Sequence, residues 1–248
     1  EFKHLPIIIG ESDPEGCAAC SEADYPYNAY RNGTLYASYT AASFARKYEL
    51  ADHYGVNLLG AVTWGFEFED QPWYAGFRDM ATNGVNKPVL NVFRMFGMMQ
   101  GQRVKVSQDE MLYDYDKIIN KKVRAENSDI NALAAVDDRS LSVMVWNYHD
   151  KNDLDVAPEN VKINISNILT GKALLTHYRI DQEFSNSYTV WKEMGSPQNP
   201  SKEQIEKLEK AGQLQLLNSP QWVNIKEGRT VLEISLPRQG ISFLNFKW

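Results

Sequence analysis

The amino-terminal part of the sequence alternates strands with helices, and this alternation most constrains the fold. Residues 5–10 form a short apolar run ending in glycine, which is typical of a strand buried on both faces of a parallel sheet. Residues 35–54 carry alanine and aromatic side chains at helical spacing, and Gly55 stands where a helix would end. Residues 56–64 predict a second strand, and residues 88–99, which open with a proline, predict a second helix.

Two strand–helix units cannot close a sheet by themselves. An open parallel edge would expose unpaired backbone groups and apolar faces, so the units need neighbours. We therefore expect residues 1–101 to be the carboxy-terminal part of a catalytic (β/α)₈ barrel, also called a TIM barrel, whose amino-terminal part is missing from this truncated chain. A small self-contained α/β layer is the alternative.

The pattern changes to alternating strands separated by turns after residue 102. Strands are predicted at 130–136, 141–148, 161–165, 173–180, 230–236 and 241–246. This pattern predicts an antiparallel β-sandwich over residues 102–248, with the boundary segment at 101–129. One surface helix is expected at 201–211, because Ser201 precedes a Lys-Glu-Gln sequence and Gly212 follows.

Charge and hydropathy argue against two classes of partner. The 26 Lys and Arg residues against 32 Asp and Glu give a net charge of -6, and the sequence contains no long basic run, so nucleic acid is not an expected partner. No apolar stretch approaches the roughly 20 residues that span a bilayer, so we expect no membrane partner either.

The cysteine pair allows several interpretations. The spacing of Cys17 and Cys20 suits a redox pair, half of a zinc site or a small loop disulfide. The surrounding glycine, proline and serine residues favour a structural loop over redox chemistry. With only four histidines at unrelated spacings we predict no metal and no other cofactor, and His177 is expected to be a satisfied core or surface histidine.

Catalytic residues of barrel enzymes lie where the strands end, and Glu11 stands there. It follows the first predicted strand directly, after Gly10, which permits close approach of a ligand. A helix-capping or salt-bridging carboxylate is the alternative interpretation of Glu11.

The second predicted strand ends in an aromatic and acidic segment at 62–73. Its side chains suit an aromatic platform and carboxylates that bind sugar hydroxyls, so we predict a substrate-binding set. The predicted set is Trp64, Glu67, Glu69 and Trp73. Loop packing with solvated acids is the alternative.

Several motifs along the chain carry a family resemblance. They are Ile-Ile-Ile-Gly-Glu at 7–11, Val-Thr-Trp at 62–64, Gly-Phe-Arg-Asp at 76–79, the segments 83–88 and 93–95, and in the second half 177–181, 185–191 and 194–198. On these motifs the chain resembles the carboxy-terminal portion of glycoside hydrolase family 39, the β-xylosidase and α-iduronidase family. The match runs nearly end to end.

The resemblance implies a retaining glycosidase of xylosidase type acting on an oligosaccharide or glycoside, with Glu11 as the nucleophile. The family carries its acid/base on an Asn-Glu-Pro motif earlier in the barrel, and no such motif occurs here. Glu15, Glu67 and Glu69 do not occupy that motif. This chain alone is therefore expected to be inactive, and the missing part of the barrel is an expected partner.

Two departures separate the chain from the better-known pattern. Ser12 and Asp13 follow the nucleophile where a Tyr/Trp-Asn type sequence is expected, and the Cys17 loop is unusual, so the substrate specificity is open. The substrate class and the cysteines predict an extracellular or periplasmic protein, with any signal peptide upstream of Glu1. The alternative function is a noncatalytic carbohydrate-binding or structural sandwich that uses aromatics such as Trp191 or Trp222.

Overall fold

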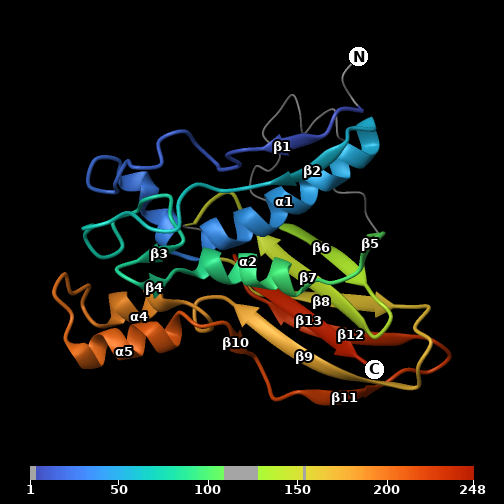
Figure 1. Cartoon of the computed structure of the whole chain (residues 1–248). Helices are drawn as coiled ribbons and strands as arrows, with labels where there is room; N and C mark the ends of the chain where they lie inside the picture. Colours follow the sequence, from blue (N-terminus) through green and yellow to red (C-terminus); the bar gives the residue numbers. More distant parts are fainter. Residues whose placement is uncertain (1–3, 109–127, 153–154) are drawn as a thin grey trace.

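A computed structural model describes residues 4–108, 128–152 and 155–248 of the chain (Figure 1). Strand β1 (Ile7–Ile9) pairs in parallel with β2 (Leu58–Ala61), and α1 (Thr34–Tyr54) connects them. Helix α1 ends at Gly55, which adopts a left-handed φ of 62° that glycine accepts without steric cost. Helix α2 (Pro88–Met98) opens with its proline. The predicted order of strand, helix, strand and helix is confirmed.

Burial of β1 differs from the expectation. The run was predicted to be covered on both faces, but Ile8 is 65% exposed, and Leu59 on β2 is 59% exposed. The reason is that β1 and β2 form a two-stranded sheet, with no further strand beside them among the described residues. Strand β2 is also shorter than predicted, because the residues after Ala61 turn toward the loop that follows β1.

Three short elements of this part were not predicted. A 3₁₀ helix, η1 (Pro26–Asn32), precedes α1, and a hairpin of β3 (Ala81–Thr82) and β4 (Val85–Asn86) precedes α2. The hairpin turns through Asn83 and Gly84, both with positive φ.

The second half forms two antiparallel sheets. The larger is seven-stranded, in the order β10-β9-β13-β7-β6-β5, with β11 pairing with β9. Its strands are β5 (Gln102–Val104), β6 (Asp129–Val136), β7 (Ser140–Tyr148), β9 (Lys172–Ile180), β10 (Gln215–Leu216), β11 (Gln221–Asn224) and β13 (Ile241–Lys247). The smaller sheet pairs β8 (Glu159–Ile165) with β12 (Thr230–Leu236). All six predicted strands are present. Strands β5, β10 and β11 were not predicted. Of the boundary segment predicted at 101–129, residues 109–127 lie outside the described residues.

The larger sheet is covered on both faces, which produces three layers (Figure 1). Consecutive side chains of a strand point to opposite faces, so Phe243 packs toward Ala41 of α1 and Met95 of α2. Its neighbour Leu244 packs with Leu236 of the smaller sheet. The larger sheet therefore joins the strand–helix units to the smaller sheet through two apolar cores.

Two helices between β9 and β10 lie beside the β3–β4 hairpin. Helix α4 (Ser187–Glu193) begins after Asn186, whose side chain accepts a hydrogen bond from the backbone of Thr189. Helix α5 (Lys202–Ala211) carries the predicted capping box at Ser201. Helix α4 escaped prediction because it is short and made largely of residues with modest helix propensity.

Trp191 on α4 is buried, and its indole nitrogen donates to the carbonyl of Pro197 over 3.0 Å. It stacks on Tyr188 within this helix pair. Trp191 therefore cannot serve as the sugar platform of the binding-module alternative. Trp222 is 68% exposed.

The prediction that His177 is a satisfied histidine is confirmed. It is buried on β9, and its Nε2 lies 2.9 Å from the hydroxyl of Ser242. Burial, with a smaller effect of the nearby Arg179 charge, lowers the pKa of His177 to about 4.

This buried histidine predicts an acid-sensitive contribution to stability. The unfolded chain takes up a proton on His177 near pH 6.5, whereas the folded chain does so only near pH 4, so the free energy of unfolding should fall by about 3 kcal/mol as the pH drops across that window. Urea unfolding at pH 7 and pH 4.5 measures this loss. His177→Gln keeps a hydrogen-bonding partner for Ser242 and should lose less stability between the two pH values. An equal loss in both proteins would contradict the assignment.

Candidate active site

The ends of β1 and β2 are bonded together, which brings the two predicted site segments to one place. The amide of Val62 donates to the carbonyl of Ile9 over 3.0 Å, and the amide of Ser12 donates to the carbonyl of Val62 over 2.8 Å. The hydroxyl of Thr63 donates to Asp13 Oδ1 over 2.6 Å. Glu11 therefore lies within a loop that is fixed to the exit of β2.

Arg78 is the closest charged partner of Glu11. Its Nη2 lies 2.5 Å from Glu11 Oε1, and its Nε lies 3.4 Å from Asp13 Oδ2. The side chain of Arg78 is 2% exposed and that of Asp13 is also 2% exposed, whereas that of Glu11 is 39% exposed. One buried cation thus balances a buried and an accessible carboxylate, and only Glu11 is open to a substrate.

Asp13 is held by two further donors. The phenol of Tyr36 donates to Asp13 Oδ1 over 2.9 Å, beside the bond from Thr63. Burial, together with the negative charge of Asp13, raises the pKa of Tyr36 above its ordinary value, so this phenol stays protonated and remains a donor. Asp13 therefore acts as the anchor of the loop that presents Glu11.

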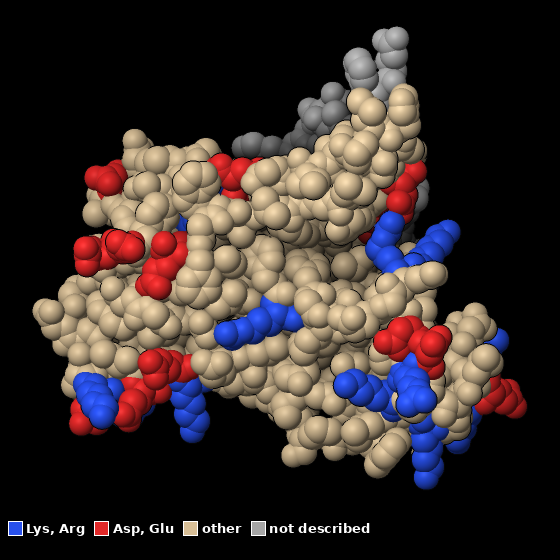
Figure 2. All heavy atoms as spheres, viewed as in Figure 1, with Lys and Arg blue, Asp and Glu red and all other residues tan. Residues whose placement is uncertain are grey.

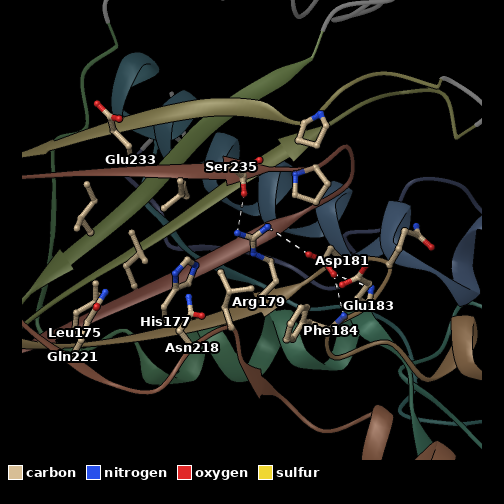
Figure 3. Close-up of a pocket in the computed structure, with 17 residues that line it drawn as sticks. Leu175, His177, Arg179, Asp181, Glu183, Phe184, Asn218, Gln221, Glu233 and Ser235 are labelled. Atoms are coloured by element: carbon tan, nitrogen blue, oxygen red, sulfur yellow. Dashed lines mark hydrogen bonds and ion pairs between the residues drawn. The ribbon is translucent and has the colours of Figure 1, made fainter.

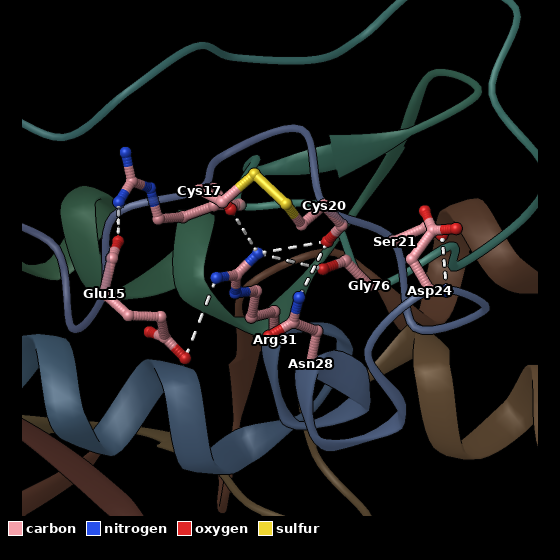
Figure 4. Close-up of a disulfide and its surroundings, with 9 residues drawn as sticks. Glu15, Cys17, Cys20, Ser21, Asp24, Asn28, Arg31 and Gly76 are labelled. Carbon is pink, nitrogen blue, oxygen red and sulfur yellow. Dashed lines mark hydrogen bonds and ion pairs between the residues drawn. A yellow bond between two sulfur atoms is a disulfide. The ribbon is translucent and has the colours of Figure 1, made fainter.

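The loop continues into the cysteine pair, which forms a disulfide (Figure 4). Arg31 donates to the carbonyls of Cys17 over 3.0 Å and of Cys20 over 3.3 Å. Glu15 lies 3.7 Å from the same guanidinium and also accepts from the phenol of Tyr30. Of the interpretations open for the cysteines, the structure supports the loop disulfide, and it ties Glu15 to neighbouring side chains.

The predicted substrate-binding residues of the second loop occupy different surroundings. Trp64 is 51% exposed and directly follows Thr63, which bonds to the Glu11 loop. Glu67 accepts from the backbone amide of Gly84 over 2.8 Å and so supports the hairpin, and Glu69 is exposed. Trp73 is half-buried against the cluster that contains Trp191, and its backbone bonds with the side chain of Gln198. Sugar contacts by these four residues stay a prediction.

The position of Arg78 is set by its neighbour along the chain. Asp79 forms a fully buried ion pair with Lys87 and accepts from the side-chain amide of Gln71 over 3.0 Å. Asp79 therefore anchors the segment from which Arg78 reaches Glu11. The sequence motif at 76–79 drew attention to these residues, but no spacing rule assigned Arg78, Asp13, Tyr36 or Thr63 to the site.

The described residues contain neither a metal-binding cluster nor a membrane-spanning helix. Within residues 4–108, 128–152 and 155–248, no group of three or more histidine, cysteine, aspartate or glutamate side chains is arranged to hold a metal ion. No helix in the described part of the chain is long and apolar enough to cross a membrane.

Comparison with known proteins identifies the family. The model of glycosyl hydrolases family 39 matches residues 1–224, and the chain belongs to this family. A β-xylosidase of Geobacillus stearothermophilus is 23% identical over 214 residues, which cover 85% of this chain and 36% of the relative. A β-xylosidase of Caldicellulosiruptor saccharolyticus is 26% identical over 143 residues, 58% of this chain and 26% of the relative.

A solved structure of a monomeric β-xylosidase from Caulobacter crescentus CB15 superimposes with a TM-score of 0.73 at 14% identity, over 98% of this chain and 46% of that one. This similarity shows the fold of the chain, and the family shown by the match over residues 1–224 contains a TIM barrel. The chain spans less than half the length of these relatives.

Proposed function

We propose that this chain is the nucleophile-bearing part of a retaining glycosidase that hydrolyses β-xylosides or similar sugars. The observation that carries the proposal is the accessible carboxylate of Glu11 at the end of β1, paired with the buried guanidinium of Arg78 over 2.5 Å. In this mechanism Glu11 attacks the anomeric carbon and displaces the leaving group, and water then hydrolyses the glycosyl-enzyme intermediate.

Arg78 and Asp13 have supporting roles in this proposal. A nucleophile must hold its oxygen near the anomeric carbon in a fixed direction, because small misplacements reduce the rate strongly. The hydrogen bond from Arg78 Nη2 fixes one oxygen of Glu11. The other carboxylate, Asp13, forms an ion pair with Nε of Arg78 and accepts hydrogen bonds from Tyr36 and Thr63. The second oxygen of Glu11 is then the attacking atom.

We propose that the units β1–α1 and β2–α2 complete a (β/α)₈ barrel with a segment outside these 248 residues. Ile8 and Leu59 are exposed on the two-stranded sheet, and further barrel strands would cover them. That segment would supply the acid/base, which in a retaining enzyme lies roughly 5 Å from the nucleophile. On the face drawn in Figure 2, acidic and basic side chains are interspersed, with no continuous basic stripe.

Substrate contacts come from the exit of β2 in this proposal. The exposed ring of Trp64 offers a flat apolar surface for a sugar face, and Glu67, Glu69 and Trp73 are further candidates from the same loop. We also propose that the protein is exported, because disulfides such as Cys17–Cys20 persist in oxidising compartments.

The test compares this chain with the complete polypeptide that its gene encodes. Proton NMR of aryl β-xyloside hydrolysis by the complete polypeptide should show β-xylose as the first product, because two displacements retain configuration. The 248-residue chain alone should be slower by roughly 10²- to 10⁴-fold, since leaving-group protonation is lost. First-formed α-xylose would overturn the retaining mechanism, and equal rates would overturn the assignment of the acid/base to an outside segment.

A further inference from the structure

The side chain of Arg31 gathers the backbone of the disulfide loop around one buried charge. Its Nη1 donates to the carbonyls of Cys17 over 3.0 Å, Cys20 over 3.3 Å and Gly76 over 3.4 Å (Figure 4). The side-chain amide of Asn28 also donates to the carbonyl of Cys20, over 2.8 Å. Arg31 is 1% exposed, so these carbonyls replace the water that a guanidinium would otherwise bind.

The disulfide gives the loop the shape that this arrangement needs. Cys17 and Cys20 are three positions apart, and an extended chain of that length would span about 10 Å. The S–S bond holds their Cα atoms 5.4 Å apart, and both carbonyls reach the same nitrogen of Arg31. Such a short bridge constrains little of the unfolded chain, so its effect should be local rather than on the stability of the whole protein.

The same loop also holds Arg78, the closest charged partner of Glu11. The backbone amide of Arg78 donates to the carbonyl of Ala18 over 3.0 Å, and its Nη1 donates to the carbonyl of Glu15. Ala18 lies inside the disulfide loop, between the two cysteines. Nη2 of Arg78 then bonds to Glu11. A chain of contacts therefore runs from the disulfide loop through Arg78 to the carboxylate at the end of β1.

Glu15 connects the two arginines a second time. Its carboxylate lies 3.7 Å from Arg31 Nη2 and accepts from the phenol of Tyr30, while its backbone carbonyl accepts from Arg78. A change in the shape of the loop that moves Glu15 would therefore disturb the surroundings of both arginines together.

We propose that the Cys17–Cys20 disulfide and Arg31 form a positioning element for Glu11, which attacks at its full rate only while the disulfide is closed. They act through Arg78, so they are positioning residues and not catalytic ones. The inference rests on the proposed function in taking Glu11 as the nucleophile.

The exposed position of Cys17 makes the disulfide open to a dithiol reductant. A thiolate of the reductant attacks Sγ of Cys17 and breaks the S–S bond, and Cys20 leaves as a thiolate that takes up a proton. The second thiol of the reductant then closes its own disulfide and releases Cys17. Two electrons and two protons pass from the dithiol to the protein, and an added disulfide oxidant reverses the exchange.

Reduction of the folded complete polypeptide with dithiothreitol tests the proposal. Phenyl β-xyloside has a poor leaving group, so attack by Glu11 limits the rate. Its kcat should fall by about 10- to 100-fold, because a displaced nucleophile attacks more slowly, while KM should change by less than about threefold. Reoxidation should restore kcat. An unchanged kcat after complete reduction would overturn the proposal.

The double variant Cys17→Ser, Cys20→Ser is the control for the reductant. It should show the low kcat from the start and should not respond to dithiothreitol. A variant with the kcat of the oxidised protein would overturn the proposal. A variant that loses as much activity with dithiothreitol as the original protein would place the sensitive bond elsewhere and would also overturn it.

Arg31→Lys tests the arginine of the positioning element. Lysine keeps the charge but lacks the planar fork, so kcat should fall by about tenfold. Reduction should then lower kcat by less than about threefold more, because both changes act on one element. Losses that simply multiply would contradict a shared element.

Arg179→Lys is the matched control. Arg179 is also buried and donates to a backbone carbonyl, that of Ser235, but it lines the cleft between β9 and β12 (Figure 3). This variant should keep full kcat. An equal loss of kcat in both lysine variants would contradict a specific role for Arg31.

Amide hydrogen exchange separates failure of this inference from failure of the proposed function. The amide of Arg78, which bonds to Ala18, should exchange at least about tenfold faster after reduction. Unchanged exchange would overturn the inference while the glycosidase stands, because this measurement uses no substrate. The proposed function fails on a different result, the absence of β-xyloside hydrolysis by the oxidised complete polypeptide.

Discussion

Replacing Glu11 by glutamine is expected to lower kcat/KM of the complete polypeptide for aryl β-xylosides by roughly 10⁴-fold or more, because the nucleophile is lost. The amide is isosteric with the carboxylate and can still accept from Arg78, so the fold should persist. Steady-state kinetics with circular dichroism on the same preparation measure both effects. Glu193→Gln, an exposed carboxylate on α4, is the matched control and should keep full activity.

Chemical rescue separates loss of the nucleophile from misfolding. In Glu11→Ala, azide has room to attack the anomeric carbon in place of the carboxylate, and an activated substrate should yield the α-xylosyl azide of inverted configuration. Retention of more than about a tenth of the activity in Glu11→Gln would rule out Glu11 as the nucleophile.

Replacing Lys87 by methionine is expected to destabilise the protein by about 3 to 5 kcal/mol, because Asp79 would remain buried without its partner. Lys87 is 0% exposed and Asp79 is 1% exposed. Burial raises the pKa of Asp79 and lowers that of Lys87, and their mutual attraction opposes both shifts. Urea unfolding measures the loss of stability. Because Arg78 is next to Asp79, Arg78 should also hold Glu11 less firmly in this variant.

The double variant Lys87→Met, Asp79→Leu removes both charges and should recover most of the lost stability. Lys202→Met is the matched control, because Lys202 is 87% exposed and lies 4.0 Å from Glu206 on the surface of α5. It should leave the unfolding midpoint unchanged. A double variant less stable than Lys87→Met alone would refute this account of the buried pair.

The main elements of the fold were predictable because their signals are local. Helix α1 has its ending glycine, helix α5 has its capping box, and the strands of the larger sheet show the period of two. The β3–β4 hairpin and β10 consist of two-residue strands, which are too short to show a period. Exposure of β1 could not be predicted from its own residues, because burial depends on which strands stand beside it.

The site was predictable only where strand ends mark it. Glu11 and Trp64 were predicted because catalytic residues follow strands, and the structure bonds their two segments together, while their roles stay a prediction. Arg78 lies 67 residues from Glu11 along the chain, and the contact depends on where the loop after β2 returns. The carboxylate of Glu67 has the chemistry needed to bind a sugar hydroxyl, but in the structure it accepts a hydrogen bond from the backbone of Gly84 and so supports the hairpin. The residue type alone does not distinguish these two roles.

Covalent trapping tests the central claim most directly. The complete polypeptide is treated with a 2-fluoro xyloside that carries a good leaving group, and the labelled peptide is mapped by mass spectrometry. The fluorine slows hydrolysis of the glycosyl-enzyme, so a retaining enzyme should accumulate one label per chain. We expect the label on Glu11. A label on another residue would contradict the assignment of the nucleophile, and no label with any of several such sugars would contradict the retaining mechanism itself.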